Sequence, residues 1–164
     1  MLKVLNKKRL YNIALYYLER FDASEEKVKQ VFKRRIYRAK LSGQEISPNI
    51  EKDIQEVIAQ LKEQGYLNNN RYLENQIRLL QNAGKSMRFM IQKLKQDGFN
   101  EEEIFTQIQN AEITDLQQAK RLVQKRKLGI YRANAEEFYQ KDLAVLARAG
   151  FPLEIAKQAL KETD

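Results

Sequence analysis

The sequence predicts an all-α protein of nine helices in three groups of three, and three observations support this prediction. Apolar residues recur at helical spacing along almost the whole chain, and no stretch shows the alternation typical of a strand. Only two prolines and six glycines occur in 164 residues, which favours helix throughout. Finally, the phrase Leu-x-x-x-Gly-aromatic occurs three times, at residues 61–66, 94–99 and 146–151.

Each copy of this phrase is predicted to end a helix. The leucine closes the buried stripe, the glycine takes a left-handed conformation that only glycine adopts cheaply, and the aromatic ring folds back on the last turn. A repeated helix end of this kind indicates repeated helical units. The predicted helix-stop residues are Gly65, Tyr66, Gly98, Phe99, Gly150 and Phe151.

The first group of helices is expected to span residues 1–65. Its opening helix has an apolar face that extends to Phe21, and Asp22 is predicted to cap the second helix, with Glu25 at the capping-box position. A loop over 41–46 precedes Ser47-Pro48, which predicts a helix start because proline suits the first helical position. The three apolar stripes are Leu10, Ile13, Ala14, Tyr17 and Leu18; Val28, Val31, Phe32, Ile36 and Ala39; and Ile50, Ile54, Val57, Ile58 and Leu61.

The second group is expected to span residues 66–111. Its first helix should stop at Gly84, and its second should start near Ser86. Asn100 and Glu103 form a capping box for a short third helix. The stripes are Tyr72, Leu73, Ile77 and Leu80; Met87, Met90, Ile91 and Leu94; and Ile104, Phe105 and Ile108.

The third group is expected to span residues 112–164. Thr114 and Gln117 form a capping box for a helix that Gly129 should end, and Asn134 with Glu137 is predicted to cap the next helix. Pro152 should open the last one. The stripes are Leu116, Ala119, Leu122 and Val123; Phe138, Val145 and Leu146; and Ile155, Ala156, Ala159 and Leu160.

The composition narrows the classes of function. Without cysteine or histidine, the chain has no disulfide, no thiolate metal site and no histidine acid–base group, so neither a metal nor another cofactor is expected. No apolar run approaches the roughly 20 residues that span a bilayer, and the first nine residues are too few and too charged for a secretory signal. We therefore expect a cytoplasmic protein that does not engage a membrane.

The net charge of +8 is unevenly distributed. Residues 1–40 carry twelve Lys and Arg against four Asp and Glu, whereas residues 41–110 carry eight against ten and residues 111–164 carry ten against eight. The N-terminal quarter thus holds a charge equal to the whole excess. Such a block attracts phosphate or an acidic protein surface.

The basic helix over 27–40 is the most suggestive functional feature. At about 100° per residue, Arg34 and Arg38 lie on one flank of its apolar stripe with Lys27, and Lys40 lies on the other with Lys29 and Lys33. A solvated helix with snorkelling side chains is the alternative. Only Glu25 and Glu26 offer acidic partners within the helix.

A second basic run, Lys125-Arg126-Lys127, closes a helix, where the dipole also favours cations. Gly84-Lys85-Ser86 resembles a fragment of a phosphate loop but lacks the first glycine of that motif and the strand that precedes it.

Three aromatic residues lie outside the core stripes, namely Tyr16, Tyr37 and Phe89. They predict either packing between repeats or a stacking surface for a partner. Asp142 lies on an apolar stripe, where a salt bridge is the default interpretation.

The order of several segments resembles the RecX family of regulatory proteins. Residues 65–72, Gly-Tyr-Leu-Asn-Asn-Asn-Arg-Tyr, look like the joint between that family's first and second repeats, and residues 17–20 followed by Ser24 look like its opening. Residues 84–86, 91–98 and 149–155 follow in the family's order, so the resemblance covers the chain from about Leu10. Asn69 departs from the family's usual aspartate, and the first unit's second joint, near Ile36-Tyr37, lacks its glycine and has a longer loop.

The resemblance implies three tandem three-helix repeats in an elongated, curved array. It also implies a non-enzymatic regulator that binds the filament of the RecA recombinase on DNA and interferes with filament growth, ATP hydrolysis and strand exchange. We expect the protein to be a monomer. Single- and double-stranded DNA are further candidate partners. From charge placement, the contact candidates are Arg34, Arg38 and Lys40, followed by Lys85, Arg88, Lys125, Arg126 and Lys127.

Two other classes of function stay open at this point. An autonomous helical module that binds nucleic acid through its basic surface would not need RecA, and its affinity would fall steeply with salt. A carboxylate enzyme would need converging Asp or Glu side chains in a pocket. The clusters at 101–103 and 136–137 are better explained as favourable charge in first helical turns, so no catalytic residue is expected.

Overall fold

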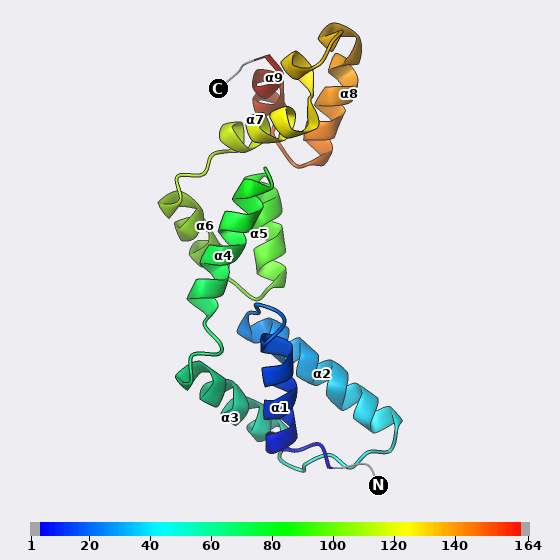
Figure 1. Cartoon of the computed structure of the whole chain (residues 1–164), viewed down its shortest axis with the longest axis vertical. Coiled ribbons are helices and arrows are strands. Elements are labelled where there is room, and N and C mark those ends of the chain that lie inside the picture. Colours follow the sequence, from blue (N-terminus) through cyan, green and yellow to red (C-terminus); the bar gives the residue numbers. More distant parts are fainter. Residues whose placement is uncertain (1–3, 162–164) are drawn as a thin grey trace. The chain divides into compact units, whose positions relative to one another are not determined.

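A computed structural model of the chain describes residues 4–161, and within them it is all-helical, as predicted. Nine α-helices and one short 3₁₀ helix follow one another in this part of the chain (Figure 1). The first three residues of the N-terminal stretch discussed above, and residues 162–164, lie outside the description. The chain divides into two compact units, residues 1–72 and 73–164.

The first unit is built from α1 (Lys7–Leu18), α2 (Glu25–Leu41) and α3 (Ile50–Glu63). α1 packs against both other helices (Figure 1), and their predicted stripes supply the core. Phe21 departs from the prediction, since it lies beyond the end of α1 and is 56% exposed. The buried residues are Leu5, Leu10, Ala14, Ala23, Val28, Phe32, Ala39, Ile54, Val57, Ile58, Leu61 and Leu67.

Leu5 ties the N-terminal segment to the loop between α2 and α3. It forms an isolated parallel bridge with Ile46, in which its N–H donates to the Glu45 carbonyl at 2.8 Å and its carbonyl accepts from the Ser47 N–H at 2.9 Å. The Leu5 side chain is fully buried. This strap fixes the start of α1 against the loop that leads into α3.

Two of the predicted helix starts in this unit are wrong. α2 is capped by Ser24, whose hydroxyl accepts from the Lys27 N–H at 3.3 Å, and not by Asp22. Glu25 is consequently the first residue of the helix. α3 begins at Ile50, two residues beyond Pro48, because Ser47 and Pro48 form a turn in which the Ile50 N–H donates to the Ser47 carbonyl at 3.2 Å.

α4 (Asn69–Asn82) begins in the first unit and continues into the second. Its first residue, Asn69, accepts a hydrogen bond from the Glu25 N–H at 2.8 Å through its side-chain oxygen. An orphan donor at the start of α2 is thereby satisfied. The asparagine that departs from the family pattern therefore has a defined structural role.

The second unit continues with α5 (Met87–Gln96), α6 (Glu101–Asn110), α7 (Asp115–Arg126), α8 (Ala135–Arg148) and α9 (Leu153–Lys161). α7 and α8 both pack on α9, and the 3₁₀ helix η1 (Gly129–Tyr131) lies against them. The buried cluster here is Ala119, Leu122, Val123, Leu128, Leu146, Phe151, Ala156, Ala159 and Leu160. Phe105, predicted for a stripe, is 44% exposed.

The predicted caps of this unit are mostly present. Ser86 caps α5, and both expected capping boxes form, at Asn100 and at Thr114. Asn134 stands at the start of α8, but its side chain makes no capping hydrogen bond, because its backbone is left-handed with φ of 57°. The end of α7 also differs: Lys127, with φ of 54°, takes the left-handed position, and Gly129 begins η1.

The glycines of the three repeated phrases are all left-handed, with φ of 77° at Gly65, 97° at Gly98 and 92° at Gly150. Phe99 and Phe151 fold back as predicted. Each is buried, and each N–H donates at 3.2 Å to the carbonyl of the leucine five residues earlier.

Tyr66 does not fold back, and this prediction is wrong. It is 51% exposed, and the next residue, Leu67, is buried and donates its N–H to the Leu61 carbonyl at 3.1 Å. The first joint is therefore one residue longer than the other two. The sequence-predicted division at 65, 111 and 164 stays a prediction, since the two compact units divide inside α4.

Candidate functional site

The C-terminal half of α2 presents the first group of predicted contact residues to solvent. Arg34, Arg38 and Lys40 are exposed, and none of them forms an ion pair with any residue in the range 4–161. Arg34 donates through Nε to the Gln30 carbonyl of its own helix at 3.3 Å. Tyr37, 64% exposed, lies in sequence between the two arginines. We call Arg34, Tyr37, Arg38 and Lys40 the α2 surface.

The N-terminal half of α2 is used within the protein. The ammonium of Lys27 donates to the buried Tyr72 hydroxyl at 2.5 Å, so this lysine does not join Arg34 and Arg38 on a free flank. Lys29 pairs with Glu25 at 2.6 Å, and Lys62 of α3 also pairs with that carboxylate. Burial raises the pKa of Glu25, but the hydrogen bonds and charges of Lys29 and Lys62 outweigh it and hold the pKa below its usual value.

A second cationic site lies in the second unit, where the α4–α5 loop meets the ends of α7 and α8. It is a groove of about 280 Å³, which we call the basic groove. Its basic lining residues come from three elements: Lys85 from the loop, Arg126 from α7 and Arg148 from α8. No acidic side chain is among its lining residues, which are Gly84, Lys85, Phe89, Leu122, Arg126, Val145, Arg148 and Ala149.

The structure brings together only some of the predicted residues of this unit. Lys85 and Arg126 line the basic groove, and Arg88 lies beside it, with its Cδ 3.8 Å from the position that a Cβ at residue 150 would occupy. Lys125 and Lys127 are exposed and do not line the groove. The α2 surface belongs to the other compact unit.

Hydrogen bonds lock the elements around the basic groove. The Ser86 hydroxyl donates to the Ala149 carbonyl at 2.8 Å, which joins the α4–α5 loop to the end of α8. The buried Gln118 amide of α7 donates to the carbonyls of Gln81 and Lys85 at 3.0 and 3.1 Å. Arg121 adds a hydrogen bond to the Gln81 carbonyl at 2.6 Å. The Gln81 carbonyl near the end of α4 and the Lys85 carbonyl of the loop are thus both bonded to α7, which fixes the walls of the groove.

Gly84 allows the close approach that this joint requires. Its φ is 67°, and a Cβ at this position would lie 3.3 Å from the Leu122 backbone nitrogen. Any other residue would be strained in conformation and crowded against α7. The resemblance of residues 84–86 to a phosphate loop therefore has a packing explanation, although the same loop places Lys85 in the groove.

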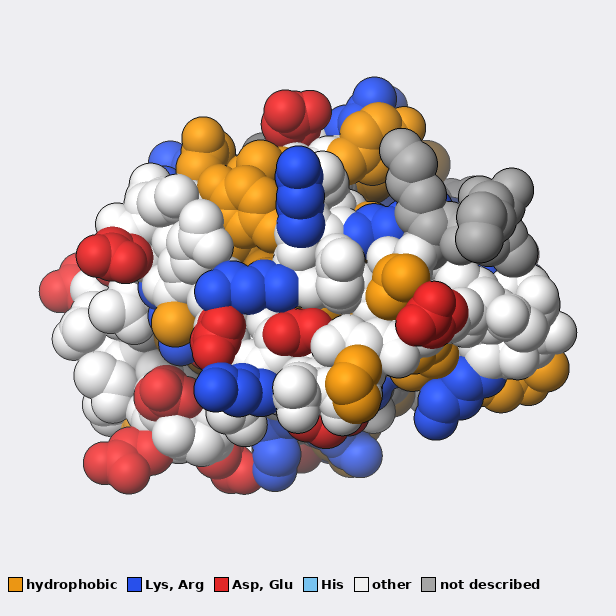
Figure 2. Space-filling view, turned by 90° about the horizontal axis from the view of Figure 1, so that it is seen from below, with side chains coloured by type: hydrophobic (Ala, Val, Ile, Leu, Met, Phe, Trp, Pro, Cys, Tyr) orange, Lys and Arg blue, Asp and Glu red, His pale blue; other side chains and the backbone are white. Residues whose placement is uncertain are grey.

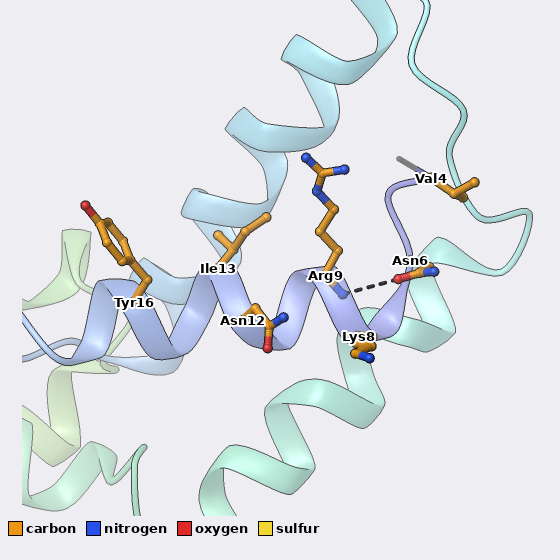
Figure 3. A pocket seen from close by; sticks show the side chains of 7 residues that line it. All are labelled: Val4, Asn6, Lys8, Arg9, Asn12, Ile13 and Tyr16. Atoms are coloured by element: carbon orange, nitrogen blue, oxygen red, sulfur yellow. Dashed lines mark hydrogen bonds between the residues drawn. The ribbon is translucent and has the colours of Figure 1, made fainter. Parts of the chain in front are cut away.

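The first unit carries a larger hollow of a different kind beside α1. It measures about 770 Å³ and is lined mostly by apolar atoms (Figure 3). Arg9, Ile13 and Tyr16 project from the same side of α1, and the Asn6 side chain accepts from the Arg9 N–H at 3.2 Å. The Arg20 guanidinium lies 3.6 Å from the centre of the exposed Tyr16 ring. This surface suits a protein partner better than a phosphate.

Charged and hydrophobic side chains are mixed on one face of the molecule. On the face shown in Figure 2, Lys and Arg side chains gather beside a hydrophobic cluster, with Asp and Glu side chains interspersed. Such mixed surfaces favour a partner that offers both apolar and acidic groups. A bare polyanion alone would not use the apolar cluster.

A curated relative is similar over most of the chain. The regulatory protein RecX of Myxococcus xanthus (strain DK1622) is 32% identical over 157 residues, covering 92% of this chain and 83% of the relative. The chain belongs to the RecX family of regulatory proteins. A solved structure described as the crystal structure of regulatory protein RecX shares the fold, with a TM-score of 0.63 at 19% identity, covering 93% of this chain and 72% of that one. No family model matches.

Sequence reasoning missed one basic residue of the groove, Arg148. Arg148 occupies the last turn of α8, where the helix dipole also favours a cation. Its position in the sequence therefore did not indicate a binding role. Asp142 is a structural residue, as expected. It is 2% exposed, accepts from the Gly129 N–H at 2.8 Å and pairs with Arg132 at 2.7 Å.

Residues 4–161 contain no group of three or more acidic, cysteine or histidine side chains placed to hold a metal ion. Among the same residues, no helix combines the length and the apolar character needed to cross a membrane. The α2 surface and the basic groove are therefore the features from which a function is best argued.

Proposed function

We propose that this chain is a non-enzymatic regulator that binds RecA–DNA filaments and restrains the recombinase. Membership of the RecX family supports regulation, and the family resemblance supplies RecA as the target. The observation that carries the proposal is the α2 surface, whose Arg34, Arg38 and Lys40 are exposed and without ion-pair partners among the described residues. Such a surface meets either DNA phosphate or an acidic protein surface.

In the proposed mechanism, the chain inhibits RecA by occupying a surface of the filament. A chain bound along the filament would oppose filament growth, ATP hydrolysis by RecA and strand exchange, without performing chemistry of its own. Lys85, Arg88, Lys125, Arg126 and Lys127 are proposed as secondary contacts with the filament. The chain is proposed to act as a monomer in the cytoplasm, in DNA repair and recombination.

ATP hydrolysis by RecA on single-stranded DNA tests this proposal. Adding the purified chain at increasing ratios to RecA should suppress hydrolysis, whether it is added before or after filament assembly. The chain alone should hydrolyse no ATP. Unchanged RecA activity at a stoichiometric excess of the chain would contradict the proposed function and leave the fold untouched.

Co-sedimentation separates this function from that of an autonomous nucleic-acid-binding module, which the charge of +8 also favours. The chain should pellet with RecA filaments more than it binds bare DNA or free RecA at the same salt concentration. Equal binding to bare DNA and to filaments would favour the autonomous module.

A further inference from the structure

We propose that the hollow beside α1 is a docking site for an acidic amphipathic helix of a partner protein. We call this surface the α1 hollow, and the described residues that line it are Val4, Asn6, Lys8, Arg9, Asn12, Ile13 and Tyr16. The α1 hollow goes beyond the proposed function, because it involves neither DNA nor the α2 surface and its test needs no RecA. Shape, apolar lining and charge together select this occupant.

The shape of the α1 hollow fits the side chains along one face of a helix. Its volume of about 770 Å³ has room for several aliphatic side chains. Arg9, Ile13 and Tyr16 stand at helical spacing on α1 and project from the same side (Figure 3). From Arg9 to Tyr16, α1 rises by about 10 Å, or roughly two turns. A partner helix of similar length can place anchors at i, i+3 or i+4 and i+7 along this row.

Tyr16 gives the α1 hollow a pre-positioned aromatic anchor. Its ring is 63% exposed, and the Arg20 guanidinium lies 3.6 Å from the ring centre. The same guanidinium donates to the Tyr16 carbonyl at 3.1 Å, so ring and guanidinium are held together before a partner arrives. Tyrosine and arginine are enriched among the residues that dominate the energy of protein interfaces. A side chain held in this way loses little further freedom on binding.

The charged residues that line the α1 hollow are cations. Lys8 and Arg9 line it, Arg20 borders it through Tyr16, and none of the described lining residues is acidic. Lys8 and Arg20 are exposed, and neither forms an ion pair with another described residue. Lys7, by contrast, pairs with Glu56 at 2.7 Å. Carboxylates beside the apolar face of a partner helix would complement Lys8 and Arg20.

Two other kinds of occupant fit the α1 hollow less well. A nucleic acid would engage the cations, but the mostly apolar wall offers nothing to its phosphates. A lipid surface would engage the cations and Tyr16, but a flat bilayer cannot fill a concave space. An acidic amphipathic helix uses the apolar wall, the concave shape and the cations together.

Fluorescence anisotropy with a labelled synthetic peptide tests the docking site on the full chain. The probe is a peptide of about 14 residues, or roughly four helical turns, with leucines along one face and glutamates elsewhere. One control peptide has the same composition in a shuffled order without an apolar face, and another has lysine in place of every glutamate. The acidic amphipathic peptide should bind with a Kd about tenfold or more below that of either control.

The double variant Lys8→Glu/Arg20→Glu tests the charge complementarity. It should raise the Kd for the acidic amphipathic peptide about fivefold or more, and rising salt should narrow the difference from the parent. Lys33→Glu/Arg71→Glu is the matched control, since it reverses one exposed lysine and one exposed arginine of the same unit outside the α1 hollow. This control should bind the peptide almost as the parent does. Far-ultraviolet circular dichroism should show the same helix content in all three proteins.

Tyr16→Ala tests the aromatic anchor, with Tyr66→Ala as its control. Tyr66 is 51% exposed in the same unit and does not line the α1 hollow. Loss of the anchor should raise the Kd about fivefold or more in Tyr16→Ala, whereas Tyr66→Ala should stay near the parent.

Four outcomes would overturn the proposal. One is binding of the shuffled peptide as tight as that of the amphipathic one. Another is an unchanged Kd in both Tyr16→Ala and Lys8→Glu/Arg20→Glu. Vesicles of phosphatidylcholine and phosphatidylglycerol in equal parts that bind the parent but not Tyr16→Ala would assign the α1 hollow to lipid. A molecular mass that rises with concentration in the parent but not in Tyr16→Ala would assign it to a second copy of the chain. None of these measurements contains RecA, so failure here and failure of the proposed function are distinguishable.

Discussion

Single glycine residues end several helices of this protein because the backbone there must take a positive φ. Gly98, with φ of 97°, lets Phe99 turn back and donate its N–H to the Leu94 carbonyl at 3.2 Å. That hydrogen bond satisfies one of the orphan carbonyls at the end of α5, and it places the Phe99 ring in the interior. One backbone conformation therefore controls both a cap and a core contact.

Gly98→Val should lower the free energy of unfolding by about 1 kcal/mol or more, because a β-branched residue is strained at positive φ. Urea denaturation monitored by circular dichroism measures the change. Gly98→Asn is the control, since asparagine tolerates the left-handed region, and it should lose less stability. A valine variant as stable as the parent would show that the left-handed cap contributes nothing.

The Glu25 carboxylate predicts an acid-sensitive contribution to stability. Its pKa is lowered in the folded protein, because the contacts with Lys29 and Lys62 outweigh the burial that raises it. The stabilisation is therefore present above the carboxylate's unfolded pKa and is lost as pH falls through the lower folded pKa. Urea unfolding between pH 6 and about pH 3 should show a smaller fall in stability for Glu25→Gln than for the parent.

Glu56 provides a comparison on the surface of the same unit. The Lys7 hydrogen bond and charge also hold its pKa below the usual value, with Lys52 adding a small effect. Both partners of this pair are well exposed. Because water screens such a pair, Glu56→Gln should flatten the pH profile less than Glu25→Gln does. Parallel profiles for the parent and Glu25→Gln would contradict the proposed role of Glu25.

The two halves of helix α2 have different roles, one in internal contacts and the other in an exposed cationic surface. Its first turns are tied inward through Ser24, Lys27 and Glu25, whereas its last turns carry the α2 surface. Arg38 and Lys40 in the last turn also complement the helix dipole. The last turns also place Ile36 and Ala39 against the core, but the side chains of Arg34, Arg38 and Lys40 are exposed and can be altered without removing a core contact.

Arg34→Glu/Arg38→Glu should weaken binding to RecA–DNA filaments and leave helix content intact. The two side chains lie one turn apart and are exposed, so the double change reverses a contiguous patch with little effect on stability. Filament co-sedimentation across a salt series measures the effect. Arg71→Glu/Arg78→Glu, which reverses two exposed charges on α4, is the matched control.

The salt series also identifies what the α2 surface meets. Contact with phosphate would make the salt slope shallower in the variant and weaken its binding to bare DNA. Contact with an acidic protein surface would lower the salt sensitivity of filament binding and leave bare-DNA binding unchanged. Equal filament binding by variant and parent at low salt would mean that the α2 surface is only solvated.

The elements that sequence predicts well are those fixed by local chemistry. The capping boxes at Asn100 and Thr114 and the cap at Ser86 depend on residues three apart, and all three form. Asp22 and Ser24 are both of residue types that cap helices, and Ser24 caps α2 in the structure. Tyr66 and Leu67 are likewise neighbours, and the buried position goes to the aliphatic side chain.

The features that sequence could not predict depend on residues far apart in the chain. Leu5 pairs with Ile46 through an isolated β-bridge, and the sequence of neither segment predicts this pairing. The basic groove joins Lys85 to Arg148, which are separated by most of two helix groups. Charge runs predicted which helices are cationic, but convergence on one groove depends on how α7 and α8 pack.

For the whole molecule, the helical fold follows from the sequence pattern and is supported by the similar solved structure. The chain divides within α4 into two compact units. The division into three tandem repeats is a prediction about the shape of the molecule in solution.

Small-angle scattering of the purified chain should therefore give an elongated particle. A compact globule of this length has a radius of gyration of about 15 Å, and three tandem repeats, each contacting mainly its neighbours, should exceed this value clearly. The measurement must be made on a monomer, because a dimer would also raise the radius. A concentration series with the molecular mass from forward scattering supplies that control. Since the proposed binding to a filament needs a long contact surface, a monomer with the radius of a compact sphere would contradict both the repeat array and the filament-binding mode that depends on it.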